Sequence, residues 1–69
     1  MTQLKRIRTQ KNLSQKELAE LSCRNVRMIQ HYEQGTKNIN NAAVITALAL
    51  AKALNVNIEN ILEEERTGV

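Results

Sequence analysis

The residues with the clearest chemical potential lie in a short polar and basic segment that runs from Asn25 to His31. An arginine such as Arg27 can donate two parallel hydrogen bonds to guanine O6 and N7, a contact that contributes about 1–3 kcal/mol of discrimination between bases. Val26 can contact the methyl group of thymine, and Gln30 or His31 can hydrogen-bond a base edge or a phosphate one helical turn further along. These residue types therefore suggest contact with double-stranded DNA rather than the making and breaking of bonds.

Two short helices joined by a tight turn are predicted to position this segment. Ser14 and Glu17 form a capping box, in which each side chain can bond the backbone N–H of the other residue. Asn25 is a favourable first cap for the second helix, and Gly35 supplies the positive φ at which a helix commonly ends. A short helix held steeply across another is a common device for placing side chains in the major groove of DNA.

The fold is predicted to be all-α, a compact five-helix domain that occupies residues 1–69. The chain has no proline, phenylalanine or tryptophan and only one tyrosine, so that Leu, Ile, Val and Ala must form the core. Such a composition favours helices over a β-sandwich. The core is expected over about residues 3–62, followed by a frayed acidic tail at 63–69. The expected helices cover residues 2–11, 15–22, 26–33, 42–54 and 58–62.

Asparagines are expected to mark most of the other helix ends. Asn12 and Asn55 tolerate the left-handed conformation that ends a helix, and they follow the first and fourth expected helices. Asn40 or Asn41 is expected to cap the start of the fourth helix, and Asn57 the start of the fifth. These positions predict short elements with tight connections throughout.

Charge is divided unevenly along the chain. Eight basic and three acidic side chains lie in residues 1–37, whereas residues 38–69 hold two basic and four acidic side chains. A basic half followed by an acidic end suits a domain that presents one face to a polyanion. The same split also arises from ordinary solvated charge, so it adds only modest support.

Several function classes are disfavoured by what the chain contains. The single cysteine, Cys23, cannot form an internal disulfide or a Cys-based zinc site, and it is expected to be a small buried or half-buried residue. No aspartate, phosphate-binding loop or nucleophile–base pair is evident, and His31 has no second ligand at metal-binding spacing. No apolar run reaches the length of a membrane span. We therefore expect a cytoplasmic protein that is not an enzyme and needs no cofactor, metal ion, small-molecule ligand or membrane.

The expected fourth helix carries two apolar faces. One stripe consists of Ala43, Ala47, Leu50, Ala51 and Leu54 and should face the core. The other face carries Ile45, Leu48 and Ala49, near Lys52. It can be covered either by the last helix and tail or by a second copy of the chain. The residues expected in such a homodimer interface are Ile45, Leu48, Ala49, Lys52, Ile61 and Leu62.

The chain resembles the phage-repressor and Cro-like helix-turn-helix regulators, also called the xenobiotic-response-element family. The resemblance covers about residues 3–62 and rests on several motifs whose order and spacing agree. They are Arg8, LSQKELA at 13–19, the spacing to Ile29, YEQG at 32–35 and LAKALNVNIENIL at 50–62. The resemblance implies a lambda-repressor-like five-helix fold that is usually dimeric and binds operator DNA through the helix at 26–33.

The resemblance also implies roles for individual residues, and a buried ion pair between Arg8 and Glu33 that ties the first helix to the third. The expected base contacts are Val26, Arg27, Met28, Gln30 and His31. The expected phosphate contacts are Gln15, Lys16, Asn25, Lys37, Asn38 and Asn41. Two positions depart from the family: Cys23 replaces a glycine whose φ tends to be positive, and Arg24 replaces a buried aliphatic residue whose role its stem could take.

The sequence therefore predicts a sequence-specific DNA-binding transcriptional regulator, a repressor or autoregulator. It would bind a near-palindromic operator in double-stranded DNA as a homodimer, associated with the nucleoid of a bacterium or a phage-infected cell. Two alternatives stay open. One is an antitoxin that uses the same fold to bind a protein toxin, and the other is a protein-interaction module that has lost DNA binding.

Overall fold

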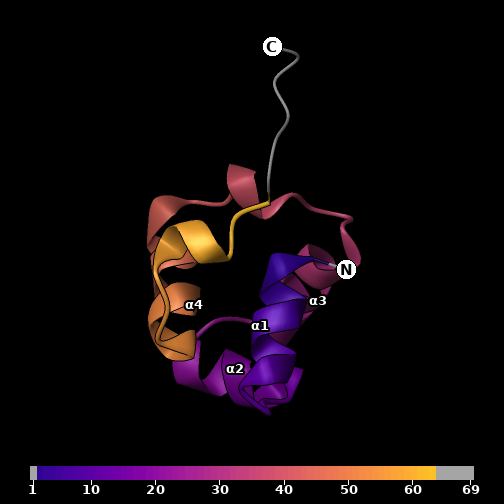
Figure 1. The fold of residues 1–69 in the computed structure, drawn as a ribbon. Coiled ribbons are helices and arrows are strands. Elements are labelled where there is room, and N and C mark those ends of the chain that lie inside the picture. The colour runs from indigo at the N-terminus through magenta and orange to yellow at the C-terminus, as the bar shows by residue number, and fades with distance from the viewer. Residues whose placement is uncertain (1, 64–69) are drawn as a thin grey trace.

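The computed structural model describes residues 2–63, and this part of the chain is helical with no strand. The helices are α1 (Gln3–Gln10), α2 (Gln15–Ser22), α3 (Val26–Gln34) and α4 (Val44–Leu54), as Figure 1 shows. Two single turns of 3-10 helix, η1 (Ile39–Asn41) and η2 (Ile58–Asn60), complete the described elements. The predicted all-α class is confirmed, and α2 has the predicted bounds. Helix α1 is one residue shorter than predicted at each end, and α3 is one residue longer at its C-terminal end.

The prediction of five α-helices is wrong, because the described residues contain four. The segment expected as a fifth helix forms the 3-10 turn η2, in which Asn60 N–H bonds Asn57 C=O at 2.9 Å and Ile61 N–H bonds Ile58 C=O at 3.1 Å. Asn57 stands at the N-cap position of this turn, but its side chain makes no capping hydrogen bond. A segment this short has little chance to repay the entropy of nucleating an α-helix.

Helix α4 begins later than predicted, and neither Asn40 nor Asn41 caps it. Its N-cap is Ala43, which has no side-chain capping bond. The residues before it form η1 instead, because Ile39 is drawn into the core and the Asn38 carboxamide oxygen accepts the Asn40 N–H at 2.9 Å. Ala43 is accordingly exposed and does not belong to the core stripe in which it was expected.

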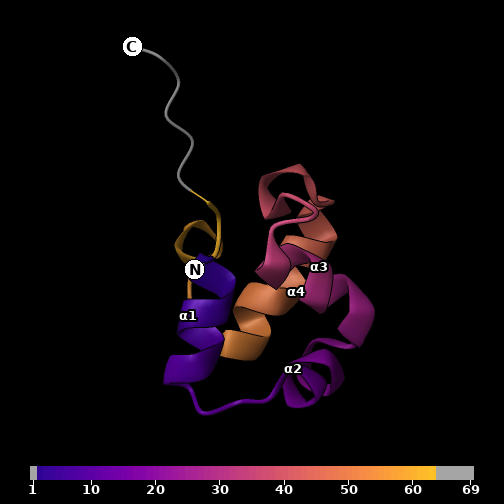
Figure 2. The same cartoon turned by 90° about the vertical axis from the view of Figure 1, so that its right-hand side faces the viewer.

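The core is built from aliphatic side chains of all four described α-helices, together with Ile39 of η1 and Ile61, which follows η2. Figure 2 shows the chain crossing from the C-terminal end of α1 to α2 and then turning back into α3. Helix α2 packs against both α3 and α4. The buried cluster consists of Leu4, Ile7, Leu18, Ala19, Ile29, Ile39, Leu50, Ala51, Leu54 and Ile61. Tyr32 is half-buried and packs against this cluster. Burial of apolar side chains supplies most of the favourable free energy of folding.

Four helix ends use the left-handed backbone conformation. Asn12 (φ 59°), Cys23 (φ 56°) and Asn55 (φ 59°) adopt it, as does Gly35 (φ 84°). The predictions for Asn12, Asn55 and Gly35 are confirmed. Cys23 keeps the conformation that glycine usually supplies, so the α2–α3 turn retains its geometry although a non-glycine residue there costs roughly 1–2 kcal/mol.

Candidate nucleic-acid interface

The start of α2 is fixed by the predicted capping box. Ser14 Oγ accepts the Glu17 N–H at 3.0 Å, and Glu17 Oε1 accepts the Ser14 N–H at 2.8 Å. Four N–H groups at the beginning of a helix lack intrahelical partners, and the serine takes one of them. The N–H groups of Gln15 and Lys16 lie before it, at the end of the helix dipole that favours an anion. The geometry at this end of α2 therefore suits a phosphate.

The turn between α2 and α3 differs from the expectation in one respect. Cys23 is exposed, not buried, because the left-handed residue sits on the outside of the turn. The turn is closed by the N–H of Arg24, which bonds Ala19 C=O at 3.0 Å. Arg24 itself is half-buried, and its Nε is sealed from solvent without a hydrogen-bond partner among the described residues. Part of the Arg24 side chain is thus buried at a position where an aliphatic residue was expected.

Helix α3 presents its first turn to solvent. Asn25 Oδ1 accepts the Arg27 N–H at 2.7 Å, which confirms Asn25 as the N-cap and leaves its amide nitrogen available for other contacts. Val26 and Arg27 are exposed, whereas Ile29 is fully buried two residues later. The remaining expected base contacts, Met28, Gln30 and His31, are half-buried. Apart from its last residue, Gln34, the exposed part of α3 is therefore its N-terminal end, the part that contacts base edges in helix-turn-helix complexes.

The predicted Arg8–Glu33 pair is present and joins three helices. Arg8 Nε lies 2.6 Å from Glu33 Oε2, and Arg8 Nη2 donates to Glu33 Oε1 at 3.0 Å. Gln15 Nε2 donates to the same Oε1 at 3.0 Å, and Arg8 Nη1 donates to Leu13 C=O at 2.6 Å. The side chains of Arg8 and Glu33 are only 12% and 2% exposed. One carboxylate thus fixes α1, the start of α2 and the end of α3 relative to one another.

The electrostatics of this pair follow from its hydrogen bonds. Donation to Glu33 raises the pKa of Arg8, burial opposes the increase, and the attraction between the two charges adds to it. Gln15 has two amide hydrogens, and only one is needed for the bond to Glu33. The network that holds α3 in place therefore also aims the second amide hydrogen of Gln15, the residue expected to contact a phosphate.

The loop after α3 carries the other expected phosphate contacts. Lys37, Asn38 and Asn41 are exposed and border a hollow. His31 links this loop to α3, since its Nδ1 lies 2.8 Å from Thr36 Oγ1 and its C=O accepts the Lys37 N–H at 3.3 Å. In both views α3 lies between α2 and this loop (Figures 1 and 2). The candidate phosphate contacts accordingly flank the candidate base contacts. The lining residues of the hollow are Tyr32, Thr36, Lys37, Asn38, Asn41, Ala42 and Ala43.

Part of the expected dimer surface is exposed and part is not. Ile45 is 69% exposed and Leu48 40%, whereas Ile61 is 0% exposed and lies in the core. Ile61 is therefore removed from the expected interface, because the 3-10 turn points it inward. Val44, also 69% exposed, joins the patch although sequence reasoning missed it. Helix α4 begins at Val44, so this residue lies in the exposed first turn. The neighbouring asparagines predicted an earlier helix start, and the exposure of Val44 was therefore not expected.

The other expected interface residues border the patch. Lys52 is exposed, while Ala49 and Leu62 are half-buried, and Leu62 packs against the core. The described chain through residue 63 leaves Ile45 and Leu48 uncovered, and the remainder of the expected tail lies outside the described residues. Glu63, assigned to a frayed tail, is instead hydrogen-bonded to Gln3 and Asn40.

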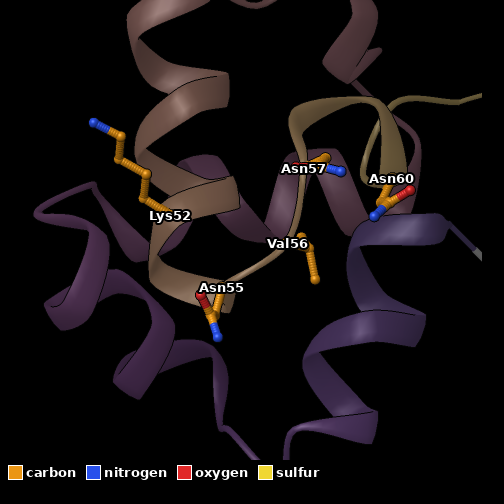
Figure 3. A pocket seen from close by; sticks show the side chains of 5 residues that line it. All are labelled: Lys52, Asn55, Val56, Asn57 and Asn60. Carbon is orange, nitrogen blue, oxygen red and sulfur yellow. The ribbon is translucent and has the colours of Figure 1, made fainter.

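A second hollow, of about 420 Å³, lies between the end of α4 and η2, and none of the predicted DNA contacts lines it (Figure 3). Its lining is Lys52, Asn55, Val56, Asn57 and Asn60, and Lys52 extends away from the other four. Between residues 2 and 63 no group of three His, Cys, Asp or Glu side chains could hold a metal ion. Within the same residues no helix has the length and apolar character needed to cross a membrane.

The comparison with protein families agrees with this geometry. A family profile described as Helix-turn-helix, of the Cro/C1 type, matches residues 4–61. No curated protein and no solved structure gives a significant match. The matched residues include the whole of the α2–turn–α3 unit and the Arg8–Glu33 pair that braces it. The chain belongs to the Cro/C1-type helix-turn-helix family of DNA-binding regulatory proteins.

Proposed function

We propose that this protein is a sequence-specific transcriptional regulator that inserts the N-terminal end of α3 into the major groove of DNA. The observation that supports the proposal best is the Arg8–Glu33–Gln15 network, which holds α3 against α1 and α2 at a nearly inaccessible carboxylate. A recognition surface must be held rigidly to discriminate between bases. The same network leaves Val26 and Arg27 exposed at the end of α3 that would face the bases.

In the proposed complex Arg27 reads guanine and Val26 contacts a thymine methyl group. Met28, Gln30 and His31 border this surface and contribute at its edge. The second amide hydrogen of Gln15 and the N–H groups at the start of α2 bind one stretch of phosphates, together with Lys16 and Asn25. The loop residues Lys37, Asn38 and Asn41 bind phosphates on the other side of α3. Phosphate contacts of this kind set the register, and the base contacts set the sequence preference.

We further propose that two copies associate through α4. Val44, Ile45 and Leu48 form an exposed apolar patch, with Lys52 at its edge. A symmetric pair of subunits would bind a near-palindromic operator with half-sites about one helical turn apart. The protein would act as a repressor or autoregulator in the bacterial or phage-infected cell. The antitoxin alternative keeps the same DNA-binding fold and adds a protein toxin as a partner.

The decisive experiment is selection of bound duplexes from a random DNA pool, followed by substitution of Arg27. Arg27→Ala should weaken the selected site by about 1–3 kcal/mol and random DNA much less, because a base contact is lost. Arg6→Ala, which removes the same charge from α1, is the matched control. Equal losses on selected and random DNA would assign Arg27 to phosphate only. Failure to enrich any sequence would favour the interaction module without DNA binding.

A further inference from the structure

One asparagine of the loop that follows α3, Asn40, bonds this loop to Glu63, which lies after η2. Asn40 Oδ1 accepts the Glu63 N–H at 2.8 Å, and Asn40 Nδ2 donates to Glu63 C=O at 2.8 Å. The Asn40 carboxamide thus satisfies both backbone polar groups of Glu63, as a paired residue on a neighbouring β-strand would. This pair of bonds, which we call the Asn40–Glu63 clasp, joins residues 23 positions apart.

Glu63 extends the clasp to the first helix. Its Oε2 accepts the backbone N–H of Gln3, the first residue of α1, at 2.7 Å. Helix α1 is in turn bonded to α3 through Arg8 and Glu33. The contacts form a closed circuit from α3 to α1, from α1 to Glu63, and from Glu63 back to the loop that leaves α3. The position of this loop relative to α3 is therefore fixed at both ends.

The residues of the loop divide into an inner and an outer set. Ile39 is buried in the core and Asn40 is half-buried against Glu63, whereas Lys37, Asn38 and Asn41 are exposed. Burial of Ile39 fixes how closely the loop lies against the core, while the two hydrogen bonds between Asn40 and Glu63 fix the orientation of the loop. Loss of these bonds would leave the outer residues to be ordered at the moment of binding, which weakens affinity.

We propose that Asn40 is a positioning residue for DNA binding, which orients the three outer residues toward the phosphates without touching DNA itself. The inference rests on the proposed function and adds to it that affinity depends on the backbone of Glu63, on the far side of the clasp. Base preference does not depend on the clasp, since Val26 and Arg27 are held through Arg8 and Glu33. A change at Asn40 should therefore alter the salt dependence of binding and leave sequence discrimination intact.

The test is Asn40→Ala in the full chain, compared with two controls. Asn57→Ala removes an exposed carboxamide that makes no capping bond, and Ile61→Val makes a buried core side chain smaller while changing no side chain of the loop. Affinity for a selected duplex is measured over a range of salt concentrations, and amide hydrogen exchange is followed by NMR. Asn40→Ala should bind roughly threefold to tenfold more weakly and reduce the salt slope by about 1–2, the loss of one or two phosphate contacts. Both controls should keep the wild-type slope.

The two readouts separate the clasp from the proposed function. Faster exchange of the Glu63 amide and of the loop amides in Asn40→Ala, with an unchanged salt slope, would overturn the positioning role. Unchanged exchange at these amides would overturn the clasp itself. A wild-type protein that binds no duplex would refute the proposed function and with it the positioning role, whereas the exchange data would still decide whether Asn40 orders the loop.

Discussion

Replacing Glu33 with glutamine should destabilise the protein far more than any exposed substitution of the same type. The Glu33 carboxylate is 2% exposed and accepts two hydrogen bonds from Arg8 and one from Gln15. Glutamine has the same shape, but its amide nitrogen faces a donor and leaves Arg8 without a counter-charge. Removal of one partner from a buried ion pair costs about 3–5 kcal/mol. Since Arg8 keeps its bond to Leu13 C=O, we expect about 3 kcal/mol, the lower end of that range.

The destabilisation expected for Glu33→Gln is large relative to the total free energy of unfolding. A chain of 69 residues has a free energy of unfolding of roughly 3–10 kcal/mol, so that Glu33→Gln should remove at least about 30% of it. Urea denaturation followed by far-ultraviolet circular dichroism measures the change. Glu20→Gln, at an exposed glutamate of α2, is the matched control. A difference of less than about 0.5 kcal/mol between the two variants, the range of ordinary surface changes, would refute the account of the pair.

A double substitution separates stability from positioning. Replacement of both members of a buried ion pair by apolar residues is often neutral, so Arg8→Met with Glu33→Met should recover much of the stability lost in either single variant. It should not recover DNA affinity, because Gln15 then has no carboxylate to orient it. Full recovery of both would show that the pair serves stability alone.

The arginine half of the pair should not make stability depend on pH in the usual range. The pKa of Arg8 is raised in the folded state, above that of the unfolded chain. The stabilisation linked to a raised pKa is complete below the unfolded value and is lost only as pH rises through the folded value. For an arginine both values lie far above neutrality, so protonated Arg8 contributes equally under weakly acidic and weakly alkaline conditions.

The helix-turn-helix unit could be predicted from sequence because its signals are local. The capping box of Ser14 and Glu17, the N-cap Asn25 and the stop at Gly35 each act within one turn of helix, and they gave α2 and α3 to within one residue. The Arg8–Glu33 pair came from family resemblance rather than from spacing. Local chemistry thus identified the recognition unit, and the resemblance supplied its long-range brace.

The second half of the chain was predicted less well because its signals compete. Asn38, Asn40 and Asn41 can all cap a helix, and burial of Ile39 decides that the first caps a 3-10 turn. That choice delays α4 and exposes Val44. The bonds from Glu63 to Asn40 and Gln3 join residues 23 and 60 positions apart, and a glutamate at the edge of an acidic run carries no local sign of them.

Two further substitutions test the proposed assembly and the unusual turn. Ile45→Glu or Leu48→Glu should shift sedimentation toward the monomer, because a charge would have to be buried in the proposed α4 interface. Leu21→Glu, at an exposed leucine of α2, is the control and should leave the assembly state unchanged. An unchanged assembly state in the α4 variants would place the interface elsewhere. Cys23→Gly should stabilise the fold. Relief of the left-handed conformation at φ 56° gains roughly 1–2 kcal/mol, and the greater freedom of glycine in the unfolded chain offsets about 0.5–1 of it. The net gain of about 0.5–1 kcal/mol corresponds to a Tm increase of a few degrees for a domain of this size. A fall in Tm would mean that the Cys23 side chain stabilises the turn by more than its backbone conformation costs.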